Sequence, residues 1–297
     1  MSVPMHTLSP APTGAERASA SGEHASIGSV LLEMGKITPE NAERVLRMQK
    51  ELGIRFGEAA IKLGLITDAD IQQVLARQFD YPYLLEGESK FSPKLVAAYQ
   101  PFTPQVEALR AVRSQLMLRW FTQGRKALAV VSLDEEDGGS IFAANLAVVF
   151  SQLGEQTLLV DGNLRAPSQQ QIFDLGNGLG LSDILAGRAG QEAVSRIDSF
   201  VALSVLPSGT LPPNPQELLG RDTFRNLSAD LEQRYDVVLY DAPPFATGAD
   251  ALPLVARAGG VIIVVRKNRS RYNDIAALSD RIAQSGAQIV GTVLVDH

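Results

Sequence analysis

The sequence predicts a doubly wound α/β fold with a mostly parallel sheet, preceded by a small all-helical domain. Two observations predict it: apolar, β-rich runs alternate with helical stretches after residue 126, and a helical pattern is repeated before residue 85. The runs are ALAVVSL (127–133), TLLVD (157–161), LSVLPSG (203–209), DVVLYDAPP (236–244), GVIIVVRK (260–267) and IVGTVLVD (289–296). Near-continuous Val, Ile and Leu is what a parallel sheet covered on both faces requires.

The amino-acid composition argues against several classes of function. With 297 residues, 45% of them hydrophobic, the chain can form more than one folded unit. Its net charge of −6 and dispersed basic residues give no reason to expect a nucleic-acid partner. It has no cysteine, which excludes thiolate metal sites, and no apolar run near the roughly 20 residues of a membrane helix.

The first 25 residues are rich in Ser, Ala, Pro and Gly. They lack the basic start and continuous apolar stretch of a signal peptide, so we expect a disordered leader over 1–25. We therefore expect a cytoplasmic protein.

A duplicated pattern occupies 27–85. IGSVLLEMGKITPENAERVLRMQ (27–49) aligns with FGEAAIKLGLITDADIQQVLARQ (56–78), so that Gly28 matches Gly57 at a spacing of 29 residues. In each copy a short apolar helix ends at a glycine, and Thr38 or Thr67 stands at the N-cap of the next helix. We expect two helical hairpins packed against each other.

A connector and a charged helix follow. Residues 86–104 hold several prolines without periodicity and are predicted to be a linker, after which the α/β domain covers 105–297. The helix expected over 105–121 places Glu107, Arg110 and Arg113 three residues apart on one face. This face is either a solvated helix surface or an interface that uses the arginines in another subunit.

The segment after the first run has the context of a Walker A loop: strand, glycine-containing turn and a helix that begins with serine. With Ser140 on the last position of Gly-x4-Gly-Lys-Ser/Thr, Gly138 is retained and Gly139 stands where the lysine belongs. Four acids, at 134–137, occupy the loop. One acid about 7 Å from a phosphate costs roughly 2 kcal/mol at an effective dielectric near 20, so we expect impaired ATP binding.

Two other strand ends carry acids. Asp161 ends the run TLLVD, and Asp241 ends a buried run in YDVVLYDAPP. Ligands of parallel sheets bind at the carboxyl ends of the strands. Asp241 has the position of a Walker B carboxylate, which holds magnesium or its water.

The repeat at 27–85 resembles the N-terminal domain of type II secretion and pilus ATPases, a family with members that bind cyclic di-GMP. The family pattern starts each half with Arg-Leu-Gly, whereas here the halves start Ser26-Ile27-Gly28 and Arg55-Phe56-Gly57. One guanidinium is therefore missing and Arg55 remains. The resemblance leaves two interpretations open, a docking module and a cyclic di-GMP site at Arg55.

Residues 95–297 resemble the bacterial tyrosine kinases of capsule and exopolysaccharide chain-length determination, within the P-loop NTPases related to partition ATPases. The resemblance is carried by EALRAVRSQL, AANLAVVFSQLGEQTLLVDGNLRAP, GLSDILAG, LPSGTLPPNPQELL and YDVVLYDAPP. It implies ATP and Mg as cofactors, a membrane-anchored polysaccharide chain-length or export protein as partner, and homo- or hetero-oligomers. Through such a partner, a cytoplasmic chain would be peripheral at the inner membrane.

Carried over by position, the resemblance implies Ser140, Asp161 and Asp241 as magnesium ligands, with Asp161 and Asp241 also catalytic. It implies Gly138, Gly139 and Ser140 as the cofactor-binding loop. Glu107, Arg110 and Arg113 match the family's Glu-x2-Arg-x2-Arg subunit-contact motif.

The chain departs from the family pattern at three places. Gly139 replaces the Walker A lysine, Asn163 replaces the second acid of the Asp-x-Asp motif, and none of the six tyrosines lies at the end of the sequence, where the family carries a tyrosine cluster. Three functions are compatible with this: a pseudokinase that regulates polysaccharide export, an active kinase that recruits a lysine such as Lys126, and a cyclic di-GMP-responsive adaptor.

Overall fold

The structure is a computed structural model that describes residues 26–78, 81–85, 87–176 and 178–296. The chain forms two compact units, one up to residue 80 and one from Tyr81 onward. The predicted domain boundary at residue 85 therefore differs from the observed division by a few residues. The predicted leader, 1–25, lies outside the described residues.

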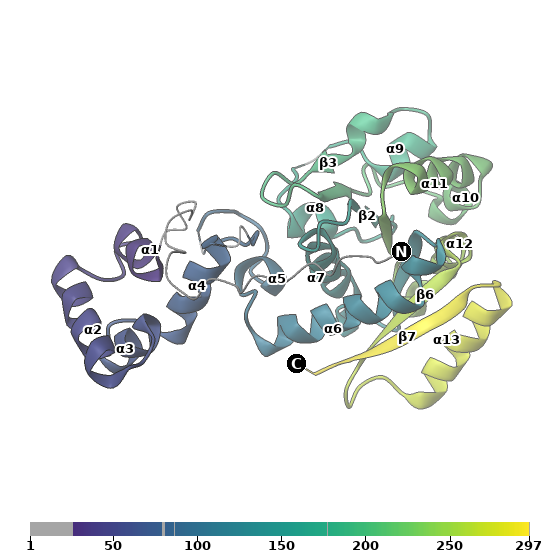
Figure 1. Cartoon of the computed structure of the whole chain (residues 1–297). Coiled ribbons are helices and arrows are strands. Elements are labelled where there is room, and N and C mark those ends of the chain that lie inside the picture. The colour runs from purple at the N-terminus through teal and green to yellow at the C-terminus, as the bar shows by residue number, and fades with distance from the viewer. Residues whose placement is uncertain (1–25, 79–80, 86, 177, 297) are drawn as a thin grey trace, which may run out of the picture. The chain divides into compact units, whose positions relative to one another are not determined.

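The first unit consists of two helical hairpins, as the repeat predicts (Figure 1). Its helices are α1 (Ile27–Glu33), α2 (Pro39–Leu52), α3 (Phe56–Lys62) and α4 (Asp68–Gln78). Thr38 and Thr67 each accept the backbone N–H three residues on at 3.3 Å, which confirms them as N-caps. Gly35 and Gly64 have φ of +67° and +66°, values that favour glycine. Apolar side chains from all four helices form a single core.

The second unit is built on a seven-stranded sheet with the order β3-β4-β2-β5-β1-β6-β7. The strands are β1 (Ala127–Ser132), β2 (Thr157–Asp161), β3 (Ser195–Arg196), β4 (Leu203–Leu206), β5 (Val237–Asp241), β6 (Gly260–Arg266) and β7 (Gln288–Val295). Every pairing is parallel except β3 with β4. The α/β prediction is confirmed, and only the two-residue strand β3, too short to give an apolar run, was not predicted.

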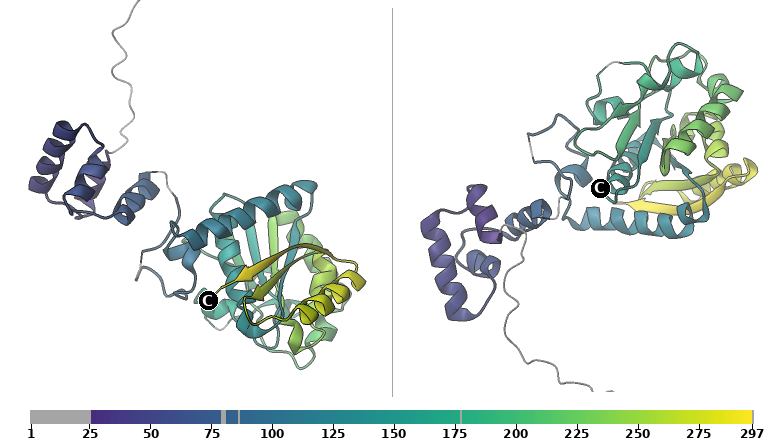
Figure 2. Two further views of the ribbon diagram at one scale, coloured as in Figure 1. Left: turned by 90° about the horizontal axis from the view of Figure 1, so that it is seen from below. Right: turned by 45° about the horizontal axis from the view of Figure 1, so that its top comes forward.

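Helices cover both faces of this sheet (Figure 2). One face packs against α5 (Val96–Tyr99), α6 (Pro104–Arg119), α7 (Gly139–Ser151) and α8 (Gln169–Ile172). The other packs against α9 (Leu181–Leu185), α10 (Pro215–Leu219), α11 (Asp222–Arg234), α12 (Ala251–Ala258) and α13 (Tyr272–Gln284). Side chains of β1 alternate between the two cores, as the period of a strand requires.

The segment predicted to be a linker is an integral part of the second unit. Leu95, Ala97 and Ala98 are buried in the core that includes α6 and α7. The backbone is held as well, because the N–H of Ser92 donates to the carbonyl of Ile172 at 2.8 Å. The linker prediction for 86–104 is wrong because prolines stop regular periodicity without preventing burial of the apolar residues between them.

Candidate functional site

The loop after β1 joins the strand to α7 through a short 3₁₀ turn over Glu135–Asp137. Gly138 has φ +77°, a conformation that favours glycine. Gly139 is buried, and a Cβ atom there would lie 2.9 Å from the Ser132 hydroxyl oxygen. The loop thus retains a strand, turn and helix, but the residue in the lysine position has little room for a side chain.

The four acids of this loop point in different directions. Asp137 is fully buried, and its carboxylate accepts the N–H of Asp134 at 3.0 Å. Glu136 forms an ion pair with Arg269. Of the four, only Glu135 lines the cavity over Gly138 and Ser140. The acids of the loop therefore reach this cavity only through Glu135, because the carboxylates of Asp137 and Glu136 are bonded elsewhere and Asp134 is not part of the cavity lining.

The strand-end acids meet at the carboxyl edge of the sheet. Asp161 of β2 and Asp241 of β5 are paired in register and are fully buried. The Ser140 hydroxyl donates to Asp241 Oδ1 at 3.1 Å, bringing the three predicted magnesium ligands together. Asp161 accepts backbone N–H groups from Asn163, Ser168 and Gln169 at 2.9 to 3.1 Å.

Gln169, the first residue of α8, covers this pair. Its side chain is fully buried, and its Nε2 donates to Asp241 Oδ2 at 2.7 Å and to the Ser140 carbonyl at 3.1 Å. Sequence reasoning missed this residue. The signal was the run of three glutamines at 169–171 directly after a strand-end motif, a polar run where a helix packs on the sheet.

Burial controls the charge of the two acids. Desolvation, followed by the neighbouring charge of Asp241, raises the pKa of Asp161 to about 8. Desolvation also raises the pKa of Asp241 to about 6, against the opposing hydrogen bonds from Gln169 and Ser140. Burial of two neighbouring carboxyl groups therefore favours a protonated form over the ionised form that an exposed aspartate has near neutral pH.

These residues do not fit a magnesium ion. All four carboxylate oxygens of Asp161 and Asp241 already accept hydrogen bonds, and neither acid lines the neighbouring cavity. Magnesium requires oxygen ligands in a nearly octahedral arrangement, whereas Asp241 is bonded to an amide donor. Within the described ranges, no group of three or more His, Cys, Asp or Glu residues is arranged to hold a metal.

A cavity of about 310 Å³ lies over the loop and the start of α7. Its lining includes the loop glycines Gly138 and Gly139, Ser140, Asn163, and Lys94 from the segment predicted to be a linker. Lys94 is exposed and lies 44 residues before Gly138 in the sequence (138 − 94). Sequence reasoning did not identify it because no pattern links that segment to the loop.

Lys126, the lysine considered as a replacement for the Walker A lysine, is at the wrong edge of the sheet. It precedes β1, whereas the loop follows that strand. Its Nζ donates to the Tyr235 carbonyl at 2.9 Å and lies 4.0 Å from the Asp236 carboxylate. The suggestion that Lys126 serves the cavity is therefore wrong.

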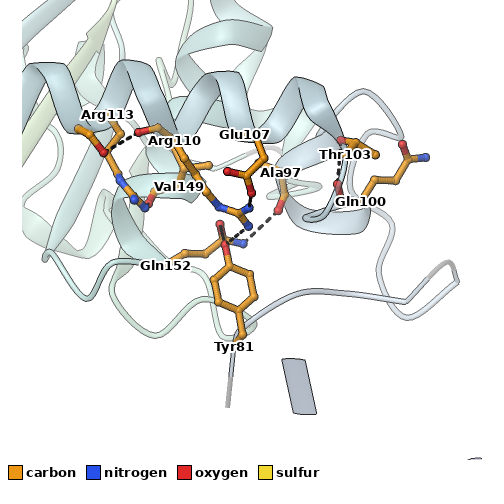
Figure 3. Close-up of polar contacts among 10 residues, drawn as sticks. Tyr81, Ala97, Gln100, Thr103, Glu107, Arg110, Arg113, Val149 and Gln152 are labelled. Carbon is orange, nitrogen blue, oxygen red and sulfur yellow. Dashed lines mark hydrogen bonds and ion pairs between the residues drawn. The ribbon is translucent and has the colours of Figure 1, made fainter. Parts of the chain in front are cut away.

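The charged face of α6 is bonded within its own unit (Figure 3). Arg110 pairs with Glu107 and donates to the Tyr81 hydroxyl at 2.6 Å, with its guanidinium 5.2 Å from the ring centroid. Arg113 donates to the Val149 carbonyl at 2.8 Å, and burial lowers its pKa. The arginines hold α6 against α7 and the Tyr81 segment, so a role in subunit contact remains a prediction.

In the helical unit, Gly28 and Gly57 lie within α1 and α3. A Cβ atom on Gly28 would lie 3.1 Å from the Phe56 ring, and one on Gly57 would lie 2.8 Å from Ile71. Both glycines are thus explained by close packing. Arg55 is the exposed N-cap residue of α3.

No family model matches the chain. It is 30% identical over 206 residues to tyrosine-protein kinase YwqD of Bacillus subtilis, a match that covers 69% of this chain and 87% of YwqD. It is 31% identical over 201 residues to tyrosine-protein kinase Wzc of Salmonella typhimurium, covering 68% of this chain and 28% of Wzc.

Solved structures agree with these matches. The chimerical protein CapA2B2 superposes with a TM-score of 0.65 at 33% identity, covering 75% of this chain and 97% of that one. The kinase domain of Escherichia coli tyrosine kinase ETK superposes with a TM-score of 0.67 at 27% identity, covering 73% and 85%.

Proposed function

Because the chain belongs to the bacterial tyrosine kinase family, we propose that it is a pseudokinase, a regulatory member that acts in exopolysaccharide synthesis or export without efficient phosphoryl transfer. The family's polysaccharide role supports the process. The chemistry of the buried acids supports the loss of activity.

One observation carries the proposal: the side-chain amide of Gln169 bonds to Asp241, where the family would use the carboxylate for magnesium. Phosphoryl transfer in P-loop enzymes depends on a metal that neutralises charge developing on the phosphates. Gly139 removes the lysine that would share this task. Both losses act on the same step, so Mg-ATP should bind poorly and react slowly.

The partner in this proposal is a membrane-anchored polysaccharide chain-length or export protein, with homo- or hetero-oligomers as the assembly. The exposed side chain of Glu107, with 63% of its surface accessible, supports a contact along α6. None of the helices in the described part of the chain has the length and apolar character of a bilayer crossing.

The test is phosphoryl transfer from radiolabelled ATP with magnesium, measured as phosphotyrosine on the chain itself and on a tyrosine-rich peptide. We expect no transfer above background by the wild type. A variant with Gly139→Lys, Ser132→Gly and Gln169→Leu, which restores the lysine, makes room for it and removes the amide from Asp241, should gain transfer. Mg-dependent transfer by the wild type would refute the proposal.

A further inference from the structure

We propose that the cavity over Gly138 and Ser140 binds the polyphosphate group of a nucleotide without a divalent cation, using Lys94 as its positive charge. The inference rests on the proposed function, because a member with a disabled magnesium site can still use a bound nucleotide as a signal. Its parts are the side chain of Lys94, the side-chain amide of Asn163 and the N-terminus of α7, all of which line the cavity.

Lys94 is the cation of this cavity. It is exposed, lines the cavity and forms no ion pair within the described ranges. Its backbone is fixed to α7, because the Lys94 carbonyl accepts from Asn145 Nδ2 at 3.1 Å and the N–H of Ala97 donates to Asn145 Oδ1 at 2.8 Å. Asn145 is buried, so the lysine is held beside the start of α7.

Asn163 supplies a second feature that favours an anion. Its side chain is 5% exposed, and its Oδ1 accepts the N–H of Arg165 at 3.4 Å and of Ala166 at 3.1 Å. These bonds orient the amide, and its Nδ2 has no acceptor among the residues that the structure describes. An acid at this position would repel phosphate, whereas the amide can donate to it.

The first turn of α7 adds backbone donors. Gly139, Ser140 and Ile141 begin a 13-residue helix and line the cavity. The N–H groups of a first turn have no acceptor within the helix, and the helix dipole favours negative charge at this end. Together with Lys94, these groups outweigh the single acid of the cavity lining, Glu135, whose side chain is free to extend into water.

The buried acids explain why magnesium is not required. Both oxygens of Asp241 are occupied by Ser140 and Gln169, so an ion could be held only by the phosphates themselves. Such an ion would neutralise phosphate charge and weaken its attraction to Lys94. The geometry therefore favours the metal-free polyphosphate, the reverse of what a working kinase site requires.

The test is isothermal titration of the full chain with ATP, ADP and pyrophosphate, each in EDTA and in excess magnesium. We expect binding in EDTA that magnesium leaves unchanged or weakens. If pyrophosphate binds as tightly as ATP, the phosphates alone are recognised. If ATP binds more tightly than pyrophosphate, the protein also contacts the nucleoside. Absence of binding in EDTA, or binding that requires magnesium, would overturn the inference.

Three variants locate the site. Lys94→Gln should weaken binding about tenfold or more, as expected for a lost charge-assisted contact, and Asn163→Asp should weaken it by a similar factor. Lys90→Gln makes the same charge change at an exposed lysine outside the cavity lining and should bind like the wild type. Equal affinities of the Lys94 and Lys90 variants would refute the role of Lys94.

These results are separable from those that test the proposed function. Phosphotyrosine formation with magnesium would refute the pseudokinase and leave metal-free binding to be judged by the titrations. A chain that neither binds polyphosphate nor transfers phosphoryl groups would refute this inference alone. Thermal unfolding of each variant shows whether a change in affinity comes from loss of the fold.

Discussion

Two neighbouring regions at the carboxyl edge of the sheet differ in how they relate to the family pattern. We call the first region the floor; it consists of Asp161, Asp241 and Gln169. It includes both acids that match the family pattern, yet all three residues are buried and bonded to one another or to nearby backbone. The wall of the cavity includes Gly139 and Asn163, which depart from the pattern, together with Lys94.

The difference shows that a matched motif residue need not be available for chemistry. A buried carboxylate whose oxygens accept hydrogen bonds from the fold must be exposed and must exchange those bonds before it can hold a ligand. Residues that look like losses in the sequence, such as an amide in place of an acid, change which ligand the open surface favours. Substitutions in the wall and the floor test this contrast directly. Substitutions in α6 and the helical unit test whether other residues that match a family pattern are likewise structural.

The largest effect is expected when a lysine is placed in the wall. Gly139→Lys puts a Cβ atom 2.9 Å from the Ser132 hydroxyl oxygen, and overpacking of this kind costs about 1–3 kcal/mol of unfolding free energy. The loss should be smaller in a Ser132→Gly background, which serves as the matched reference. Urea unfolding of the wild type, the two single variants and the double variant measures how far the two substitutions depend on each other. If Gly139→Lys alone leaves the unfolding free energy unchanged, position 139 has room for a side chain and the packing argument is wrong.

The second effect concerns the floor and depends on pH. The pKa of Asp241 is raised in the folded state, so the folded protein binds the proton more tightly and loses stability as pH rises from about 4 through about 6. Asp241→Asn should therefore be more stable than the wild type by about 1–2 kcal/mol at pH 8, with the difference vanishing near pH 4. The unpartnered Oε1 of Gln169 can accept from the new amide.

Thermal unfolding at several pH values measures this difference. Glu217→Gln, a change to an exposed acid, is the control and should show no comparable slope. A variant that is less stable than the wild type at pH 8 would mean that the Asp241 charge stabilises the floor.

A third, intermediate effect separates structure from assembly on α6. Arg113→Ala leaves the Val149 carbonyl without its donor and should cost about 1–2 kcal/mol, whereas Arg110→Ala should cost less than about 1 kcal/mol. Reversing both charges would therefore disturb the fold. Glu107→Lys is the cleaner test of assembly, and sizing by light scattering should show a smaller species. An unchanged size would remove the interface role of Glu107.

The smallest effect on stability is expected in the helical unit. Arg55 is exposed and forms no side-chain cap, so Arg55→Ala should change the unfolding free energy by less than about 0.5 kcal/mol. If cyclic di-GMP binds here, the same variant should weaken it by about 1.5–3 kcal/mol, measured by titration of the full chain. Absence of binding by the wild type would leave a docking module.

Much of the fold and part of the site could be predicted from the sequence. The repeat, its threonine caps, the parallel strands and the meeting of Ser140 with two strand-end acids all follow from local patterns and strand periodicity. The linker prediction was wrong because prolines in a sequence do not show whether the residues between them are buried. In the folded chain Leu95 and Ala97 lie in the core.

By itself, then, the sequence determined the fold class, the family and the absence of a lysine at position 139, since these depend on residue type and short spacing. Only the tertiary structure decided which charges face the cavity. Gln169 reaches Asp241 across 72 residues, and Ser140 reaches it across 101. Contacts at such separations depend on strand register and on where each loop leaves the sheet. The sequence alone therefore does not show which residues are buried in the floor and which line the cavity.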